Sequence, residues 1–133
     1  MTNKTYPVEK TDAEWKAQLT PDQYAVLRGH GTERPGSCAL LNEKRVGTFS
    51  CAGCEQPLFM TGRKFESGTG WPSFFEPLEG TIETTVDSSY GMVRTEVMCA
   101  ACGGHLGHLF PDGPHPTGIR YCINSAALRL EED

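Results

Sequence analysis

The polar and apolar positions at the start of the chain predict two short helices. Thr11-Asp12-Ala13-Glu14 has the Thr-x-x-Glu pattern of a capping box, which opens the first helix. Thr20-Pro21-Asp22-Gln23 opens the second helix with proline at its first position, and Gly29 ends it. Tyr24 and Leu27 supply the apolar face of this second helix. We therefore expect residues 1–29 to form a helical lead-in that packs on the rest of the chain.

The pattern changes after residue 29 to short segments rich in β-branched and aromatic residues. Turns that contain glycine or proline separate these segments, and the chain holds 15 glycines and 9 prolines. The segments that we interpret as strands are 46–51, 57–60, 81–86, 92–99, 108–110 and 119–124. Such a series of short strands and turns predicts a mainly β fold of antiparallel sheets rather than a helical bundle.

Length and charge narrow the classes of function. A chain of 133 residues fits a single domain, which we place over residues 1–133. The net charge of −5 and the lack of a basic run argue against nucleic-acid binding. Residues 1–7 lack the apolar core of a signal peptide, and no apolar run is long enough to cross a bilayer. We therefore expect a cytoplasmic protein without a membrane partner, and in that reducing compartment its six cysteines are expected to be ligands or catalysts rather than three disulfides.

Four of the cysteines form two Cys-x-x-Cys pairs, Cys51/Cys54 and Cys99/Cys102, with 44 residues between them. Two such turns supply the four sulfur ligands of a closed tetrahedral Zn²⁺ site, which has no open position for catalysis. Each pair follows a strand candidate, so one structural zinc ion would join two strand ends that are distant in sequence. We therefore expect residues 30–130 to form a zinc-clipped β body that carries the catalytic groups.

The two pairs leave Cys38 and Cys122 unassigned, and Cys122 has the stronger setting for chemistry. It lies in Arg120-Tyr121-Cys122-Ile123-Asn124, whose alternation predicts a strand with the thiol on one face, between a guanidinium and an amide. The guanidinium of Arg120 would favour the thiolate if the two side chains meet. Cys122 is therefore the candidate nucleophile.

His105 and His108 lie three residues apart in a glycine-rich segment. On a regular strand their side chains would point to opposite faces, so a shared cavity requires a turn or a bulge, which the neighbouring glycines permit. The segment alone leaves open the alternative of two surface histidines on a glycine turn. Asp112 is close enough in sequence to accept an imidazole N–H, although such an aspartate more often only starts a turn.

The loop of residues 67–75 carries more aromatic residues than a plain connection needs. Its glycines predict a loop, and Trp71 and Phe74 are candidates to line an apolar pocket for a small group such as a methyl. Composition leaves equally open that both side chains belong to the core.

An ordered set of motifs runs through the chain. They are Gly31-Thr32-Glu33-Arg34-Pro35, the two Cys-x-x-Cys pairs, Lys64-Phe65-Glu66-Ser67-Gly68-Thr69-Gly70-Trp71-Pro72-Ser73-Phe74, His105-Leu106-Gly107-His108-Leu109-Phe110 and Arg120-Tyr121-Cys122-Ile123-Asn124-Ser125. Together they resemble the methionine-R-sulfoxide reductases of the B type, over about residues 20–130. The resemblance implies two antiparallel sheets, a zinc ion remote from the active site, and repair of oxidatively damaged methionine by a thiol mechanism.

The resemblance also implies roles for individual residues. Carried over by motif, Cys122 is the nucleophile and Trp71 packs on the substrate methyl group. His105, His108 and Asn124 manage the sulfoxide oxygen. From their own settings in the sequence, we add Phe74 and Arg120 to the expected substrate-binding set. A sulfoxide sulfur becomes electrophilic when its oxygen is protonated, and a histidine that titrates near neutral pH can be the acid. Attack by the thiolate then releases methionine and leaves a sulfenic acid.

The chain departs from a common family pattern at the step that resets the enzyme. Many members carry a resolving cysteine in the loop before the tryptophan, where this chain has Thr69. Cys38 is the remaining internal thiol, so we expect a Cys38–Cys122 disulfide that thioredoxin reduces by exchange. The alternative is a bystander Cys38 with an external reductant that acts on Cys122 directly.

Two other functions compete with this interpretation. A zinc-ribbon interaction module accounts for the Cys-x-x-Cys pairs but for none of the Trp71, His105/His108 and Cys122 segments. A thiol peroxidase or redox switch would use the same Cys122 and Cys38, and it would consume peroxide faster than methionine sulfoxide. The reductase interpretation accounts for all of these segments, and we expect it to act as a monomer.

Overall fold

The computed structural model describes residues 8–29, 31, 45–65, 67–88, 91–115 and 117–132, so Cys38 lies outside the described residues. Both predicted helices are present, as α1 (Asp12–Gln18) and α2 (Pro21–Leu27). Thr11 and Thr20 cap them, and in each case both hydrogen bonds of the capping box form. None of the helices in the described ranges is long and apolar enough to cross a membrane.

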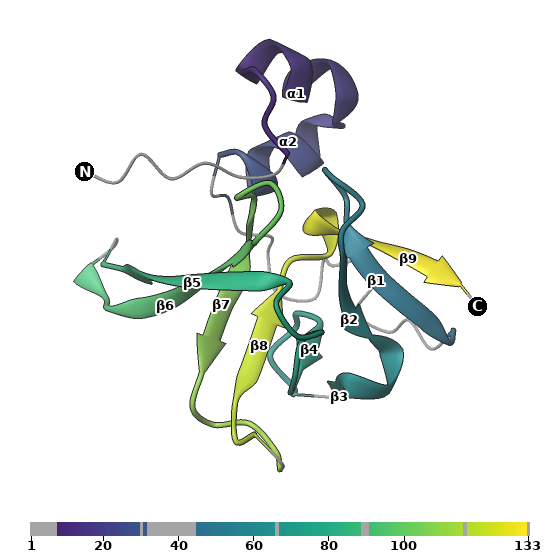
Figure 1. Cartoon of the computed structure of the whole chain (residues 1–133). Coiled ribbons are helices and arrows are strands. Elements are labelled where there is room, and N and C mark those ends of the chain that lie inside the picture. Colours follow the sequence, from purple (N-terminus) through teal and green to yellow (C-terminus); the bar gives the residue numbers. More distant parts are fainter. Residues whose placement is uncertain are drawn as a thin grey trace.

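Nine strands and two 3₁₀ helices make up the described part of the body (Figure 1). They are β1 (Gly47–Cys51), β2 (Pro57–Met60), η1 (Thr61–Arg63), β3 (Lys64–Phe65), β4 (Ser73–Phe74), β5 (Ile82–Asp87), β6 (Arg94–Cys99), β7 (His105–Phe110), β8 (Arg120–Ile123), η3 (Ser125–Ala127) and β9 (Leu128–Glu132). A three-stranded sheet has the order β2-β1-β9, and a six-stranded sheet has the order β3-β4-β8-β7-β6-β5. All strand pairs are antiparallel, which confirms the predicted mainly β fold with two antiparallel sheets.

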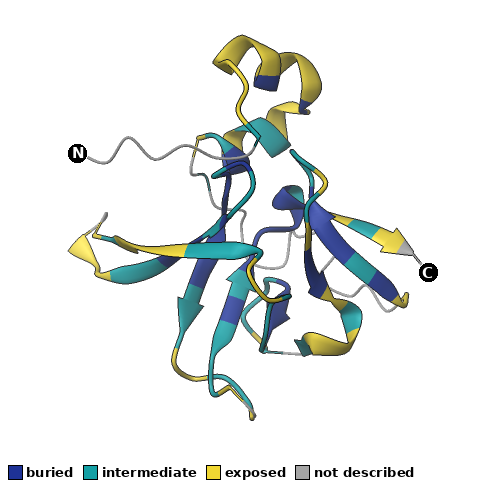
Figure 2. Ribbon diagram, in the orientation of Figure 1, coloured by how far each residue is buried: buried dark blue, intermediate teal, exposed yellow. Residues whose placement is uncertain are grey.

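An aromatic cluster joins the two sheets. The ring of Phe74 on β4 stacks on Phe59 of β2, with centroids 4.3 Å apart, and meets Phe49 of β1 edge-on at 5.2 Å. All three side chains are fully buried. Figure 2 shows that the buried residues gather on β1, β4, β7 and β8 and on η3, between the sheets. Large buried aromatic side chains of this kind dominate the energy of a core.

All six predicted strands are present: β2 has the predicted ends, the other five have shifted ends, and β3, β4 and β9 were not predicted. β3 and β4 have two residues each, too few to show a period of two. β9 carries an alternation of leucine with charged residues that had not been recognised as a strand. β7 begins at His105, three residues earlier than expected, because pairing with β6 extends it.

Candidate active site and metal centre

The four cysteines of the Cys-x-x-Cys pairs converge at the ends of β1 and β6. Their sulfur atoms all lie within 4.8 Å of one another, with Cys51 and Cys102 at 3.8 Å and Cys54 and Cys99 at 3.5 Å. In a tetrahedral site with Zn–S bonds of about 2.3 Å the sulfurs are about 3.8 Å apart, so this cluster fits such an ion. In each turn a glycine N–H also points at a cysteine sulfur, 3.4 Å away, as suits a thiolate.

The helical lead-in covers both cysteine turns. The Gln18 side chain donates a hydrogen bond to the carbonyl oxygen of Gly53 in the first turn. Arg28 donates to the carbonyl oxygen of Cys102 in the second turn at 3.0 Å, and its guanidinium lies 4.7 Å from the ring of Trp15. Helices α1 and α2 thus contact the body at the cysteine cluster.

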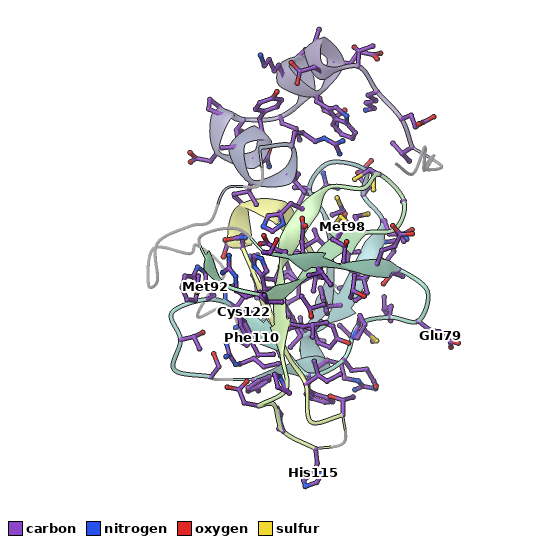
Figure 3. All side chains as sticks on the ribbon, turned by 90° about the vertical axis from the view of Figure 1, so that its left-hand side faces the viewer. Glu79, Met92, Met98, Phe110, His115 and Cys122 are labelled. Carbon is purple, nitrogen blue, oxygen red and sulfur yellow. The ribbon has the colours of Figure 1, made fainter. Side chains whose placement is uncertain are left out.

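A separate pocket of about 220 Å³ lies on the face of the six-stranded sheet that carries Cys122. Cys122 and Phe110, both labelled in Figure 3, are among its lining residues. Its lining residues come from β6, β7, β8, the position just after β8 and the loop before β4, and they are Thr69, Trp71, Arg94, Gly107, His108, Phe110, Arg120, Cys122 and Asn124. None of the four clustered cysteines lines it. Within the described residues the cysteine cluster is therefore distinct from this pocket.

Strand register explains why these side chains meet. His108 on β7 pairs with Cys122 on β8, and Phe110 pairs with Arg120, so these four side chains share one face of the sheet. Ser73 on β4 pairs with Cys122 from the other side. The next residue on each strand points to the core instead.

The Cys122 thiol has hydroxyl and cationic neighbours. Its sulfur lies 3.9 Å from the Thr69 hydroxyl, which is 2.8 Å from the hydroxyl of Ser67. Burial raises the pKa of Cys122 above its ordinary value, and the Thr69 hydroxyl, the Arg120 guanidinium and the Ser73 hydroxyl oppose this effect. The thiolate is thus disfavoured in the free pocket but has groups beside it that stabilise it.

His108 has a carboxylate partner. Its Nε2 lies 2.8 Å from Oδ2 of Asp87, the last residue of β5. Burial lowers the pKa of His108, the hydrogen bond to Asp87 raises it, and the charge of Arg94 lowers it again, with a net decrease. The imidazole is therefore mainly neutral at pH 7 in the free protein.

His105 lies on the same face as His108 but deeper. A bulge opposite Val97 and Met98 lets the two histidines converge, with ring centroids 5.4 Å apart. The convergence that the glycines permit is thus present. His105 is 2% exposed, its Nδ1 is 2.7 Å from the carboxylate of Glu96, and it does not line the pocket.

Asn124 and Arg120 are held by specific partners. The amide nitrogen of Asn124 donates to the carbonyl oxygen of Leu106 at 3.0 Å, which orients the side chain at the pocket. Arg120 forms two hydrogen bonds to Asp112, at 2.9 and 3.2 Å, and its guanidinium lies 4.4 Å from the ring of Phe110. The suggestion that Asp112 orients a histidine is wrong, because Asp112 binds Arg120 and Asp87 binds His108.

Phe74 does not reach the pocket. Its neighbour Ser73 faces Cys122, and successive side chains of a strand point to opposite faces, so Phe74 points into the core. This corrects the expectation that Phe74 contacts the substrate. Trp71 and Phe110 are the aromatic residues of the pocket.

Sequence reasoning missed three charged residues at this site. Asp87 and Arg94 pair across β5 and β6, and Glu96 pairs with His108 across β6 and β7. The period of two along Arg94-Thr95-Glu96 places both charges on one face, which is a visible signal. Which residues of β7 these charges face depends on strand register, so only the structure shows that they lie beside the histidines.

Comparison with known proteins agrees with the motifs. Residues 19–132 match the SelR domain. The chain is 54% identical to the peptide methionine sulfoxide reductase MsrB of Agrobacterium fabrum, over 98% of each chain. It is 52% identical to the MsrB of Leptospira interrogans, over 96% of this chain and 98% of the relative, and 57% identical to that of Bradyrhizobium diazoefficiens, over 93% and 90%. The chain belongs to the SelR-domain family, that of the MsrB peptide methionine sulfoxide reductases.

Proposed function

We propose that this protein reduces the R epimer of methionine sulfoxide, in peptides and oxidised proteins, to methionine. The observation that carries the proposal is the pocket in which the Cys122 thiol, the His108 imidazole and the ring of Trp71 meet. A nucleophile, an acid and an aromatic wall for a methyl group are what reduction of a methyl sulfoxide requires.

In the proposed reaction the Cys122 thiolate attacks the sulfoxide sulfur while His108 gives a proton to the sulfoxide oxygen. The oxygen passes with that proton to Cys122 as a sulfenic acid, and the substrate leaves as a thioether. The substrate sulfur gains two electrons and the cysteine sulfur loses two. Asn124 and Arg120 line the pocket beside the reacting groups, where amide and guanidinium donors stabilise the polarised oxygen.

The two histidines have different roles in this proposal. His108 lines the pocket and is the acid. His105 is buried behind it, with Nδ1 held by Glu96, and packs edge-on against the His108 ring. We therefore propose that His105 positions His108 and does not itself protonate the substrate, whereas the motif alone gave both histidines the same role.

Resetting the enzyme requires a second thiol. Thr69 is the neighbour of Cys122 in the loop before Trp71 and cannot form a disulfide. Four further cysteines cluster at the metal centre, so we propose that Cys38 condenses with the Cys122 sulfenic acid and that thioredoxin reduces the resulting disulfide. Cys38 lies outside the described residues, so this step rests on the count of thiols.

We propose that the clustered cysteines, Cys51, Cys54, Cys99 and Cys102, hold one structural zinc ion, because four sulfurs at tetrahedral spacing suit Zn²⁺. The ion would fix the ends of β1 and β6 within a single domain over residues 1–133. The five cysteines in the described ranges carry no disulfide, in keeping with a cytoplasmic protein. We further propose that the protein acts as a monomer, as expected from its sequence.

The direct test is a steady-state assay with two matched peptides that contain either the R or the S epimer of methionine sulfoxide, with thioredoxin as reductant. We expect turnover of the R peptide only. Equal turnover of both epimers, or consumption of hydrogen peroxide faster than of the R peptide, would contradict the proposal and favour a thiol peroxidase.

A further inference from the structure

One carboxylate oxygen at the edge of the active site contacts both an imidazole and a guanidinium. Oδ2 of Asp87 lies 2.8 Å from Nε2 of His108 and 3.5 Å from the guanidinium of Arg94. The side chains of Asp87 and Arg94 are 21% and 24% exposed, so their charges are only partly screened by water. Arg94 lines the pocket together with His108.

We propose that Asp87 is a positioning residue for the acid His108, and that Arg94, by sharing the same oxygen of Asp87, limits how strongly Asp87 holds the proton on that histidine. This inference deepens the proposed function and rests on it. Asp87 accepts the Nε2–H, so Nδ1 carries the proton that the imidazolium can give to the substrate oxygen. After transfer the neutral ring stays fixed, because Nε2–H is still bonded to Asp87.

Register places this group at the end of a hairpin. Asp87 and Arg94 are directly paired on β5 and β6, and Glu96, two residues after Arg94, is paired with His108 on β7. All four side chains lie on the face that bears Cys122. Among the described residues, the titratable and charged groups that face His108 from the surrounding strands are Asp87, Arg94, Glu96, His105, Arg120 and Cys122.

The balance between the two neighbours decides whether His108 is a useful acid. A carboxylate alone favours the imidazolium and would retain its proton, whereas a guanidinium alone favours the neutral ring, which has no proton to give. An acid with a pKa near the working pH transfers its proton most effectively. The shared oxygen keeps the ring between these extremes.

The test is an NMR titration of the His108 ring in the zinc-loaded full chain, with the resonance assigned from its absence in His108→Gln. Asp87→Asn keeps the shape and an acceptor oxygen but removes the charge, and we expect the pKa of His108 to fall by about one unit. Arg94→Gln removes the competing cation and is expected to raise it. Asp12→Asn, the same substitution in the remote helix α1, should leave it unchanged.

Kinetics supply a second readout. Asp87→Asn is expected to lower kcat for the R-epimer peptide about tenfold or more with little change in KM, since a positioned general acid contributes about 10²- to 10⁴-fold. Asp87→Glu, which restores the charge, should recover part of the loss. Circular dichroism and thermal melting of each variant identify any that fail to fold.

Opposite shifts in the two variants would support the proposal, because a purely structural contact has no reason to move the pKa in opposite directions. An unchanged pKa of His108 in folded Asp87→Asn, or a shift of the same sign in both variants, would overturn it. The titration needs no substrate. A wild-type protein that fails to reduce the R peptide would refute the proposed function, while the histidine shifts would still be measured.

Discussion

Replacement of Gly107 by alanine tests how closely β7 and β8 must approach for the active site to form. Gly107 lines the pocket between the two histidines. A Cβ atom at this position would lie 2.0 Å from the carbonyl oxygen of Cys122 and 3.0 Å from its carbonyl carbon, whereas ordinary contact begins at 3.4 Å. These atoms belong to the backbone, so no side-chain rotation relieves the clash, and the strands must separate locally by about 1 Å.

The clash has a cost in stability and a cost in activity. Overpacking in a core costs about 1–3 kcal/mol, and each weakened ladder hydrogen bond adds about 1 kcal/mol. A total of about 3 kcal/mol corresponds to a decrease in Tm of roughly 10 °C for a chain of this size. Because the backbone of Cys122 itself moves, and a displacement of about 1 Å can cost about 100-fold in rate, we expect kcat/KM to fall by that order.

The assay combines thermal melting with turnover of the R-epimer peptide. Gly62→Ala is the matched control, because a Cβ on Gly62 in η1 has no atom within 4 Å. It should keep the Tm and the activity of the wild type. A Gly107→Ala protein with unchanged Tm and unchanged kcat/KM would refute the account of this site as two closely apposed strands.

Three further predictions concern the metal, the resolving thiol and pH. Cys51→Ser should lose both zinc, measured by metal analysis, and thermal stability, because three sulfurs do not complete the closed site; a zinc-free protein with unchanged melting would contradict this. Cys38→Ser should release one methionine per enzyme and then stop, even with thioredoxin present, because no disulfide forms for thioredoxin to reduce. Adding Thr69→Cys should restore turnover, since Thr69 Oγ1 already lies 3.9 Å from the Cys122 sulfur. Full turnover of Cys38→Ser alone would remove Cys38 from the mechanism. Burial raises the pKa of Cys122 from 9.0 and lowers the pKa of His108 from 6.5, so the reactive form with a thiolate and an imidazolium is a minor species at every pH. The value of kcat/KM should therefore be constant between pH 6.5 and pH 9.0, decrease at a pH below 6.5 and decrease again at a pH above 9.0. If kcat/KM decreased on both sides within the interval from pH 6.5 to pH 9.0, the shifted pKa values of Cys122 and His108 would not determine the pH dependence.

Local patterns in the sequence predicted much of the fold. Capping boxes depend on residues three apart, so both helices start where Thr11 and Thr20 indicate. The cysteine cluster also follows from spacing, because each Cys-x-x-Cys turn closes on itself. The two-residue strands β3 and β4 carry no period that a sequence can reveal, and long-range pairing creates them.

The candidate site was predicted less completely. Motifs identified Cys122, His108, Trp71 and Asn124, and all four line one pocket. The prediction for Phe74 was wrong because residues 67–75 were interpreted as a loop, which does not indicate where a side chain points. In the structure Ser73 pairs with Cys122, so the next side chain, Phe74, points into the core. Sequence neighbours suggested Asp112 as the histidine partner, but strand register supplies Asp87.

The clearest distinction between His105 and His108 also required the structure. Both rings belong to one motif, and the bulge on β7 opposite β6 places one at the pocket and the other behind it. A bulge depends on the partner strand as well as on the glycines that permit it. Register across strands is therefore the information that the sequence alone did not provide.

The most direct test of the central claim is a single-turnover measurement on the reduced, zinc-loaded protein without any added reductant. The wild type and Cys122→Ser are mixed with a peptide that contains only the R epimer, and mass spectrometry follows both peptide and protein. We predict that the wild type loses one oxygen from about one peptide per chain and that a dimedone-trappable sulfenic acid or a disulfide appears at Cys122, while folded Cys122→Ser leaves the peptide unchanged. Reduction of the peptide by Cys122→Ser, or by the wild type without any modification of Cys122, would contradict the mechanism.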